Sequence, residues 1–420
     1  MVEESILTDD FLRELINVGE VDILVGLPTY NDAKTVGNVV QAVRAGLLRY
    51  FPRARAVVVN ADGGSRDGTQ ELVRAASISD MRHVSNLYAL RTLHCISTQY
   101  SREGNGGALH TILGAAELLR ASTLMVISPE SANMEPEWVD RLLRPVSKDN
   151  FDLITPIYRR HKFDALLMRT LVYPMTRAIY GKRLREPYPT DFAFSGKLAM
   201  QVLGEDPSAH EPGYDGAEMR LALSAMSGDF RVGQSFLGTK ERVEHGAADL
   251  VAAMRRTVGV LFSSLENFAA WSNIKESQPV PTIGVESEVS LEPLRVNRKR
   301  LYQMFVSGVA ELEPVLKSIL SPETLAALQA VAQQPEETCL FNDELWVKTV
   351  YEFAASHHKA VISRDHVIQA LAPLYRGKAL TFVGENREAS AEQVEQNVEA
   401  LCLTFERLKP YLLQLWGGGK

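Results

Sequence analysis

Residues 124–138 place acidic and amide side chains directly after a short apolar run. The apolar run ends at Ile127, Glu130 and Asn133 follow it, and a second acidic segment then opens a helix. Open parallel sheets bind ligands at the carboxyl ends of their strands, and Mg²⁺ that holds substrate phosphates binds one or two carboxylates. The stretch therefore predicts the metal corner of a sugar-nucleotide site. An acid in the first turn of a surface helix is the alternative.

Two polar loops precede this stretch, and each joins a strand-like apolar run to a helical segment. The first loop spans residues 27–36 and carries Asp32, and the second spans residues 60–69 and carries Asp62 before two glycines. A carboxylate followed by glycines and a helix start suits a nucleoside whose base or ribose is held by the acid. An ordinary capped turn between a strand and a helix is the alternative for both loops.

A glycine-rich segment at residues 102–111 contains three glycines ahead of an amphipathic helix. Backbone amides and a helix N-terminus can bind a phosphate group there. The segment is not a Walker A loop, because no Gly-Lys-Ser/Thr follows, and it is not the dinucleotide fingerprint, because it does not directly follow the first strand.

Three later segments each place an acid or a histidine beside glycine, proline or aromatic residues. They are residues 188–196 with Asp191, residues 212–220 with Glu218, and residues 238–246 with His245. The two acids are candidates to orient a sugar or to accept hydrogen bonds from hydroxyl groups. His245 is a candidate to complete a metal site with Glu130, and a structural histidine is the alternative.

The composition is that of a globular protein, with 45% hydrophobic and 23% charged residues among 420. The net charge of −7 argues against nucleic acid as a partner. Three scattered cysteines outside metal spacing indicate free buried thiols in a reducing compartment. The acidic N-terminus lacks the apolar region of a signal peptide, and no apolar run is long enough to span a membrane. We therefore expect a cytoplasmic protein.

Strand-like and helix-like segments alternate from residue 22 to about residue 160, which predicts βαβ units and a mainly parallel sheet. Residues 230–240 are expected to form a last strand. The proline-containing segment 276–296 is predicted to be a linker, so that residues 1–275 and 297–420 form separate domains. The second domain is expected to be helical, with Ser321 and Ser390 as helix starts. Its helices are expected to pack on the core or to mediate self-association as a dimer.

Taken together and in order, these segments resemble the GT-A glycosyltransferases of the family-2-like group. The likeness is greatest to glucosyl-3-phosphoglycerate synthases and mannosylglycerate synthases, and it covers about residues 20–275. The resemblance implies a Rossmann-like nucleotide-sugar-binding sheet with helices on both faces. It also implies a retaining enzyme that uses a nucleotide sugar and Mg²⁺ or Mn²⁺.

The resemblance assigns the donor side to motifs of the N-terminal half. The family's Leu-Pro-x-x-Asn-Glu loop matches residues 27–32, its Asp-rich turn matches residues 62–69, and its Gly-Lys-Gly loop has lost its lysine. The Asp-x-Asp metal motif becomes Ser128-Pro129-Glu130, in which only the second acid survives, and His245 corresponds to the metal histidine. The implied donor and metal residues are Leu27, Pro28, Tyr30, Asp32, Asp62, Gly104, Asn105, Gly106, Glu130 and His245.

The acceptor side follows from the later motifs. The family's Gly-Gly-Glu loop matches Pro189-Thr190-Asp191, and its Gly-Tyr-Gly-x-Glu segment matches residues 213–218 with one extra residue. Asp191 and Glu218 are then the expected catalytic residues. Thr190 and a basic group would bind an anionic acceptor such as glycerate or its phosphate. That basic group comprises Arg159, Arg160 and Lys162.

The predicted function is transfer of a hexose from a nucleotide diphosphate sugar to a small hydroxylated acceptor, as in the synthesis of glucosylglycerate-type compatible solutes. An inverting transferase with Asp191 or Glu218 as its base is one alternative. A non-catalytic protein that binds sugar nucleotides is another, since the metal motif is reduced and the loop lysine is missing. A nucleotidyltransferase would need a basic glycine-rich loop after the first strand, where only Lys34 is found.

Overall fold

The protein is described here by a computed structural model that covers residues 7–77, 93–100, 107–205, 216–240, 249–286 and 296–417. The chain forms two compact units, and each unit collects several segments. Unit 1 comprises residues 1–159, 188–246 and 280–289, and unit 2 comprises residues 160–187, 247–279 and 290–420.

The described residues of unit 1 form an eight-stranded sheet with the strand order β3-β2-β1-β4-β6-β5-β7-β8. The short strand β6 runs antiparallel to its neighbours β4 and β5, and the other pairs are parallel. The strands are β1 (Ile23–Thr29), β2 (Ala56–Asp62), β3 (Leu93–Gln99), β4 (Thr123–Val126), β5 (Leu153–Arg159), β6 (Phe192–Ser195), β7 (Val232–Thr239) and β8 (Thr282–Ile283).

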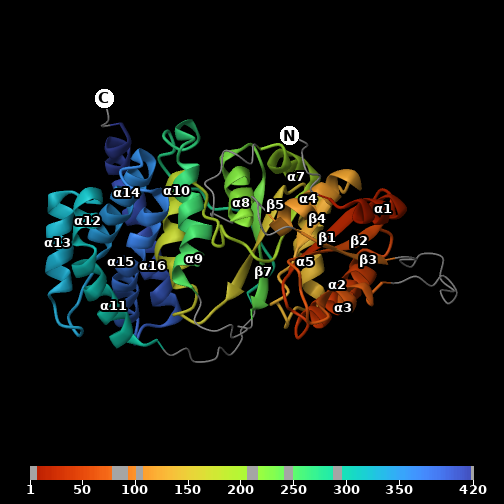
Figure 1. Ribbon diagram of the computed structural model, residues 1–420, viewed down its shortest axis with the longest axis horizontal. Coiled ribbons are helices and arrows are strands. Elements are labelled where there is room, and N and C mark those ends of the chain that lie inside the picture. The colour runs from red at the N-terminus through yellow and green to blue at the C-terminus, as the bar shows by residue number, and fades with distance from the viewer. Residues whose placement is uncertain are drawn as a thin grey trace. The chain divides into compact units, whose positions relative to one another are not determined.

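Helices cover both faces of this sheet (Figure 1). On one face, alternate residues of β1 such as Val25 share a buried apolar cluster with α2 and α5. On the other face α4 approaches so closely that a Cβ atom at Gly26 would lie 2.7 Å from Ile112 Cδ1. The predicted α/β class, with helices on both faces, is therefore confirmed. The helices of unit 1 are α1 (Asp9–Val18), α2 (Val36–Tyr50), α3 (Thr69–Arg74), α4 (Gly107–Leu118), α5 (Pro136–Asp149), α7 (Gly196–Leu203) and α8 (Ala217–Ser227).

The reversed direction of β6 brings its first residues to the carboxyl edge of the parallel strands. Phe192 at the start of β6 pairs with Val126 at the end of β4. At the same edge of the sheet, Arg159 at the end of β5 pairs with Thr239 at the end of β7. The segments that follow β4, β5 and β7 and precede β6 therefore meet at one edge of the sheet.

Unit 2 is helical, as predicted for the C-terminal part of the chain. Ser321 and Ser390 cap helices as expected: Ser321 Oγ accepts a hydrogen bond from the backbone N–H of Thr324, and Ser390 and Gln393 form the reciprocal capping box. The helical segments are η1 (Met168–Val172), α6 (Tyr173–Tyr180), α9 (Leu250–Met254), η3 (Arg255–Gly259), α10 (Val260–Ser264), η4 (Phe268–Ala270), α11 (Arg298–Glu311), α12 (Glu313–Ile319), α13 (Pro322–Ala332), α14 (Asp343–Lys359), α15 (Arg364–Glu385) and α16 (Ala391–Gly417).

The two units do not follow the boundaries expected from the sequence. Residues 160–187 and 247–275 were assigned to the first domain by sequence, and residues 276–279 to the linker, but all of them group with the C-terminal helices. The physical reason is a set of buried polar contacts: the Arg177 guanidinium, which is fully buried, makes a bidentate pair with Glu399. Lys409 Nζ likewise donates to the carbonyl oxygens of Ala178 (2.9 Å) and Trp271 (2.8 Å).

The segment 276–296, expected to be a linker, contributes a strand. Its residues Thr282 and Ile283 form β8, which pairs in parallel with β7 and extends the sheet. No helix in the described part of the chain is long and apolar enough to span a membrane.

Candidate functional site

The Asp62 carboxylate organises the turn that follows β2. Its side chain is fully buried, and Oδ1 accepts hydrogen bonds from the backbone N–H groups of Gly64 (2.8 Å) and Ser65 (2.7 Å) and from Gln70 Nε2 (3.0 Å). Oδ2 accepts from the hydroxyl groups of Ser65 (2.6 Å) and Thr29 (2.8 Å). Burial alone would raise the pKa of Asp62, but these hydrogen bonds outweigh it and hold the pKa below its usual value.

The loops after β1 and β2 are hydrogen-bonded to each other along their length. Ser65 Oγ accepts from the backbone N–H of Asn31 (2.7 Å), and Asn31 Oδ1 accepts from the backbone N–H of Arg66 (3.0 Å). Thr69 Oγ1 accepts from the backbone N–H of Asp32 (2.9 Å), so the two loops form one surface at the carboxyl edge of the sheet. Asn31 has a φ of 57°, a conformation that asparagine tolerates better than most residues.

The expected donor-binding residues of the first loop have different surroundings. Leu27 is fully buried in the core cluster and pairs with Asn60 in the sheet, and Pro28 pairs with Ala61. The Tyr30 side chain is 48% exposed. The Asp32 carboxylate accepts a hydrogen bond from the Tyr30 backbone N–H at 2.7 Å, which holds the loop in a tight turn.

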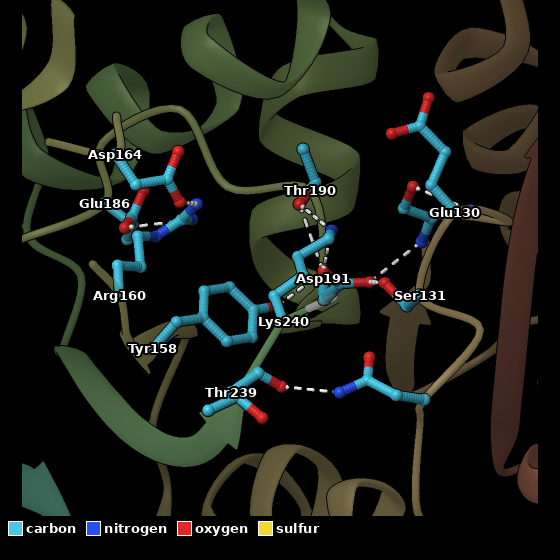
Figure 2. A network of polar contacts seen from close by, with 12 residues as sticks. Glu130, Ser131, Tyr158, Arg160, Asp164, Glu186, Thr190, Asp191, Thr239 and Lys240 are labelled. Carbon is cyan, nitrogen blue, oxygen red and sulfur yellow. Dashed lines mark hydrogen bonds and ion pairs between the residues drawn. The ribbon is translucent and has the colours of Figure 1, made fainter. Parts of the chain in front are cut away.

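Glu130 lies in the turn between β4 and α5. The backbone N–H of Glu130 donates to Ser128 Oγ (3.2 Å), and the carboxylate points away from Asp191 (Figure 2). Asn133 of the same turn donates from Nδ2 to the Thr239 carbonyl oxygen (2.8 Å). The segment predicted to hold a metal therefore lies at the carboxyl edge, tied to the end of β7.

Asp191 is the centre of a buried polar network at this corner, and Figure 2 shows the surrounding side chains converging on it. Its carboxylate is fully buried. Oδ1 accepts from the Ser128 backbone N–H (2.9 Å) and from Ser131 Oγ (2.7 Å). Oδ2 accepts from Lys240 Nζ (2.6 Å), Thr190 Oγ1 (3.0 Å) and the Tyr158 hydroxyl. These five donors fill a carboxylate that offers about four lone-pair positions.

The charge of Lys240 keeps Asp191 ionised. Burial raises the pKa of Asp191, but the adjacent Lys240 ammonium and the hydrogen bonds of Tyr158 and Ser131 outweigh burial and lower the pKa. The Lys240 side chain is only 12% exposed, and its ammonium lies 5.6 Å from the centre of the Tyr158 ring. Sequence analysis missed Lys240, although its place directly after the expected last strand was a usable signal.

The three basic residues expected to bind the acceptor fall into both units. Arg159 is the last residue of β5 in unit 1. Arg160 begins unit 2, where its guanidinium pairs with Asp164 and Glu186. Lys162 Nζ donates to the carbonyl oxygens of Arg387 (2.7 Å) and Ala389 (3.0 Å), which are also in unit 2. Arg160 and Lys162 therefore have structural contacts within unit 2, and a role for them in acceptor binding stays a prediction.

Of the remaining residues expected at the site, the structure describes only Glu218. Glu218 lies in the first turn of α8 and is half-buried. Gly104, Asn105, Gly106 and His245 lie outside the described residues.

Among the residues described, no group of three or more His, Cys, Asp or Glu side chains could hold a metal ion. Glu130 is the carboxylate at this edge that the sequence assigns to a metal, and that role stays a prediction. Mg²⁺ typically takes one or two protein carboxylates and completes its coordination with substrate phosphates and water, so one carboxylate is compatible with such an ion.

Comparison with solved structures finds similarity to glucosyl-3-phosphoglycerate synthase from Mycobacterium tuberculosis. In complex with phosphoglyceric acid, that enzyme is 20% identical, with 62% of this chain and 84% of that chain covered and a TM-score of 0.41. The structure of that enzyme with Mg²⁺ and uridine diphosphate is 19% identical in sequence. The match covers 61% of this chain and 82% of that chain, with a TM-score of 0.42.

A third structure of the enzyme contains Mn²⁺, uridine diphosphate and glucosyl-3-phosphoglycerate and is 20% identical. The match covers 63% of this chain and 86% of that chain, with a TM-score of 0.39. No family model matches this chain. No curated protein matches it either.

Proposed function

We propose that this chain is a metal-dependent retaining glycosyltransferase that moves a hexose from a nucleotide diphosphate sugar to a small, hydroxylated, anionic acceptor. The observation that carries the proposal is the carboxyl edge of the sheet. Two loops that are hydrogen-bonded to each other lie at this edge, and the Glu130 turn and the Asp191 network lie at the same edge. Ligands of open α/β sheets bind at this edge.

The donor nucleoside would lie on the surface formed by the loops after β1 and β2. Asp62 accepts five hydrogen bonds, from its own turn, from Gln70 of α3 and from Thr29, so it would act by holding the loop shape and not by binding the ribose directly. Contact with the nucleoside would fall to the exposed Tyr30 ring and to Asp32. The glycine segment 104–106 would bind the diphosphate through its backbone amides.

Glu130 would hold the divalent cation, with His245 as the second protein ligand. A bound Mg²⁺ or Mn²⁺ would offset the negative charge that develops on the leaving diphosphate. Ser128, which replaces the first acid of the usual motif, has a different task in this chain. Its backbone N–H donates to Asp191, and its hydroxyl accepts from the Glu130 backbone, so it orients the turn that presents Glu130.

The acceptor would bind at the corner formed by the ends of β5 and β7 and the start of β6. Thr190 and Arg159 are the residues of unit 1 assigned to it, and Glu218 would lie near the reacting hydroxyl. An arginine suits the carboxylate or phosphate of an anionic acceptor because its guanidinium can form two parallel hydrogen bonds.

The state of Asp191 favours the retaining reaction over an inverting one that uses this residue as base. An efficient general base has a pKa near the working pH, whereas the pKa of Asp191 is lowered and both of its oxygens already accept hydrogen bonds. A retaining transfer in which the departing phosphate accepts the proton needs no strong protein base. Asp191 would then be a positioning residue.

The experiment is to incubate the protein with UDP-glucose, Mg²⁺ and 3-phosphoglycerate or glycerate, and to determine the anomeric configuration of the product by NMR. An α-linked product supports the proposal, and a β-linked product contradicts the retaining assignment. Glu130→Ala should abolish turnover, while the matched control Glu135→Ala, at an exposed acid in the same turn, should retain it.

A second candidate is a non-catalytic protein that binds sugar nucleotides. The observation that favours it is Ser128 at the position of the first metal-binding acid. Binding of UDP-glucose that does not depend on Mg²⁺, without transfer to any acceptor or hydrolysis of the donor, would support this second function.

A further inference from the structure

Strand β7 carries one extra residue where it pairs with β5. Ile157 of β5 lies opposite Phe236. The next residue of β5, Tyr158, lies opposite Gly238, so Leu237 is the extra residue. Two residues of one strand opposite one residue of its neighbour form a β-bulge. Gly238 has a φ of 85°, which glycine adopts readily, and a Cβ atom there would meet nothing within 4 Å.

The bulge determines which face of the sheet the end of β7 presents. Side chains of a strand alternate between its two faces, so Leu237 and Lys240 would point to opposite faces of a regular strand. Leu237 lies in the buried cluster that includes Tyr158 and the core residues of α5. The Lys240 ammonium lies 5.6 Å from the centre of the Tyr158 ring, and it contacts Asp191. The extra residue therefore brings Lys240 to the face of the sheet on which Tyr158 and Asp191 lie (Figure 2).

Two side chains from the segment that follows β4 bind carbonyl oxygens on the two sides of this bulge. Arg141 of α5 donates from Nη1 to the carbonyl oxygen of Phe236 (3.0 Å), directly before the extra residue. Asn133 donates from Nδ2 to the carbonyl oxygen of Thr239 (2.8 Å), directly after Gly238. Because a bulge disrupts the ladder locally, these two contacts hold the strand where its own pairing is weakest.

The position of Lys240 matters because Asp191 is fully buried. If β7 paired with β5 without the extra residue, Lys240 would point to the opposite face, and Asp191 would lose the ammonium that lies 2.6 Å from its Oδ2. Its other donors among the described residues are a backbone N–H and hydroxyl groups, which carry no charge. A buried charge without its partner is strongly destabilising, so the ion pair depends on the bulge.

We propose that Asn133 and Arg141 are positioning residues for the proposed transfer reaction: they fasten the β7 bulge, and the bulge places Lys240 on Asp191. This inference rests on the proposed function, because that function places the reacting groups at the corner around Asp191. Neither residue needs to touch a substrate, since both act through the backbone of β7. Arg141 gives the cleaner single variant, because it lies in α5 and outside the turn that carries Glu130.

The first measurement follows Lys240 directly in the full-length protein. The chain is treated with a limiting amount of acetic anhydride at neutral pH, and acetylation of each lysine is measured by peptide mass spectrometry. Lys240 is 12% exposed and donates to a carboxylate, whereas Lys34 is exposed. A hydrogen bond to a charged group corresponds to about a tenfold factor or more, so we expect Lys240 to react about tenfold more slowly than Lys34.

The variants weaken the bulge in two independent ways. Gly238→Val places a β-branched residue at a φ of 85°, where such residues are strained, and Gly238→Ala is the milder form of the same change. The double variant Asn133→Ala with Arg141→Met removes both fastening contacts. We expect Gly238→Val and the double variant to abolish the slow reaction of Lys240, and Arg141→Lys, which keeps a donor, to retain it. Arg144→Met, at an exposed arginine of the same helix, is the matched control and should change nothing.

The second measurement separates positioning from structural support. With UDP-glucose, Mg²⁺ and 3-phosphoglycerate, the double variant should have a kcat at least about tenfold below that of the wild type, because a misplacement of 1 Å can cost about a hundredfold. Binding of UDP without metal should be unchanged, because the nucleoside would lie on the loops after β1 and β2, whose described hydrogen bonds join them to each other. A loss of fold alone would lower both quantities together.

The outcomes are distinct for the inference and for the function on which it rests. Acetylation of Lys240 as fast as that of Lys34 in the wild-type chain would overturn the inference. A slow reaction of Lys240 that persists in the double variant would also overturn it, and so would a fast reaction with an unchanged kcat. Failure of the wild-type chain to transfer glucose would contradict the proposed function, whereas the acetylation of Lys240 would still test the role of the bulge.

Discussion

Replacing Asp191 by asparagine removes the carboxylate charge at the centre of the buried network around Lys240. Removing one partner of a buried ion pair costs about 3–5 kcal/mol, and the low end applies because Lys240 is 12% exposed. Asparagine also has an NH₂ group in place of one carboxylate oxygen, and this group must face at least one donor of the network. If it faces the buried Ser128 N–H, that N–H loses its acceptor, which costs about 1–3 kcal/mol more. We therefore expect Asp191→Asn to lower the free energy of unfolding by about 5 kcal/mol.

The assay is urea denaturation followed by circular dichroism and by tryptophan fluorescence, because Trp138 lies 5.7 Å from the Tyr158 ring and reports on this unit. Lys240→Met and the double variant with Asp191→Asn complete a double-mutant cycle. Since the double variant leaves no unpaired charge, its loss of stability should be smaller than the sum of the single losses by about 2 kcal/mol. Asp10→Asn, at a largely exposed carboxylate, is the matched control and should leave the midpoint unchanged. A loss below about 1 kcal/mol for Asp191→Asn would refute the buried ion pair.

Three further predictions concern pH, metal and the helical unit. The pKa values of Asp62 and Asp191 are lowered in the folded chain. The stability that these carboxylates contribute is therefore present above their unfolded pKa of about 4 and is lost as the pH falls below it. The melting temperature should fall as the solution is acidified through this range, and it should fall less steeply with pH in Asp62→Asn. Glu130→Gln keeps the side-chain shape but loses the charge, so we expect calorimetry to show at least a tenfold weaker affinity for Mg²⁺ in the presence of UDP, and an unchanged affinity would contradict the metal role. Arg177→Met removes the buried guanidinium from Glu399 and Glu406, whose side chains are 43% and 16% exposed, so water can solvate part of the charge that is left; we expect unit 2 to lose about 2 kcal/mol in urea, whereas the same change at the exposed Arg13 should have no effect.

The order of the main elements could be predicted from the sequence because the relevant signals are local. Apolar β-branched runs at residues 23–28 and 56–60 form the central strands, and residues 230–240 contain β7. The capping box at Ser390 depends on a residue only three positions away, which is why it was visible. The strand β8 was not predicted, because two residues carry no period and its only support is pairing with β7.

The polar contacts of the site could not be predicted, since they join residues that are distant in the sequence. Asp62 and Asp191 were expected to bind ligand, and the sequence does not reveal that each carboxylate accepts five internal hydrogen bonds. The donors to Asp191 lie up to 63 residues away, at Ser128, Ser131, Tyr158 and Lys240. The direction of β6, which brings them together, also depends on pairing and not on a local pattern.

The binding of a nucleotide sugar at the carboxyl edge is the central claim, and calorimetric titration tests it most directly. Full-length protein is titrated with UDP-glucose, GDP-mannose and GDP-glucose, each with and without Mg²⁺ or Mn²⁺. We predict that one of the three donors binds, that its affinity depends on the metal, and that Glu130→Ala removes this dependence. If none of the three binds under any of these conditions, the account of this edge as a donor site is wrong.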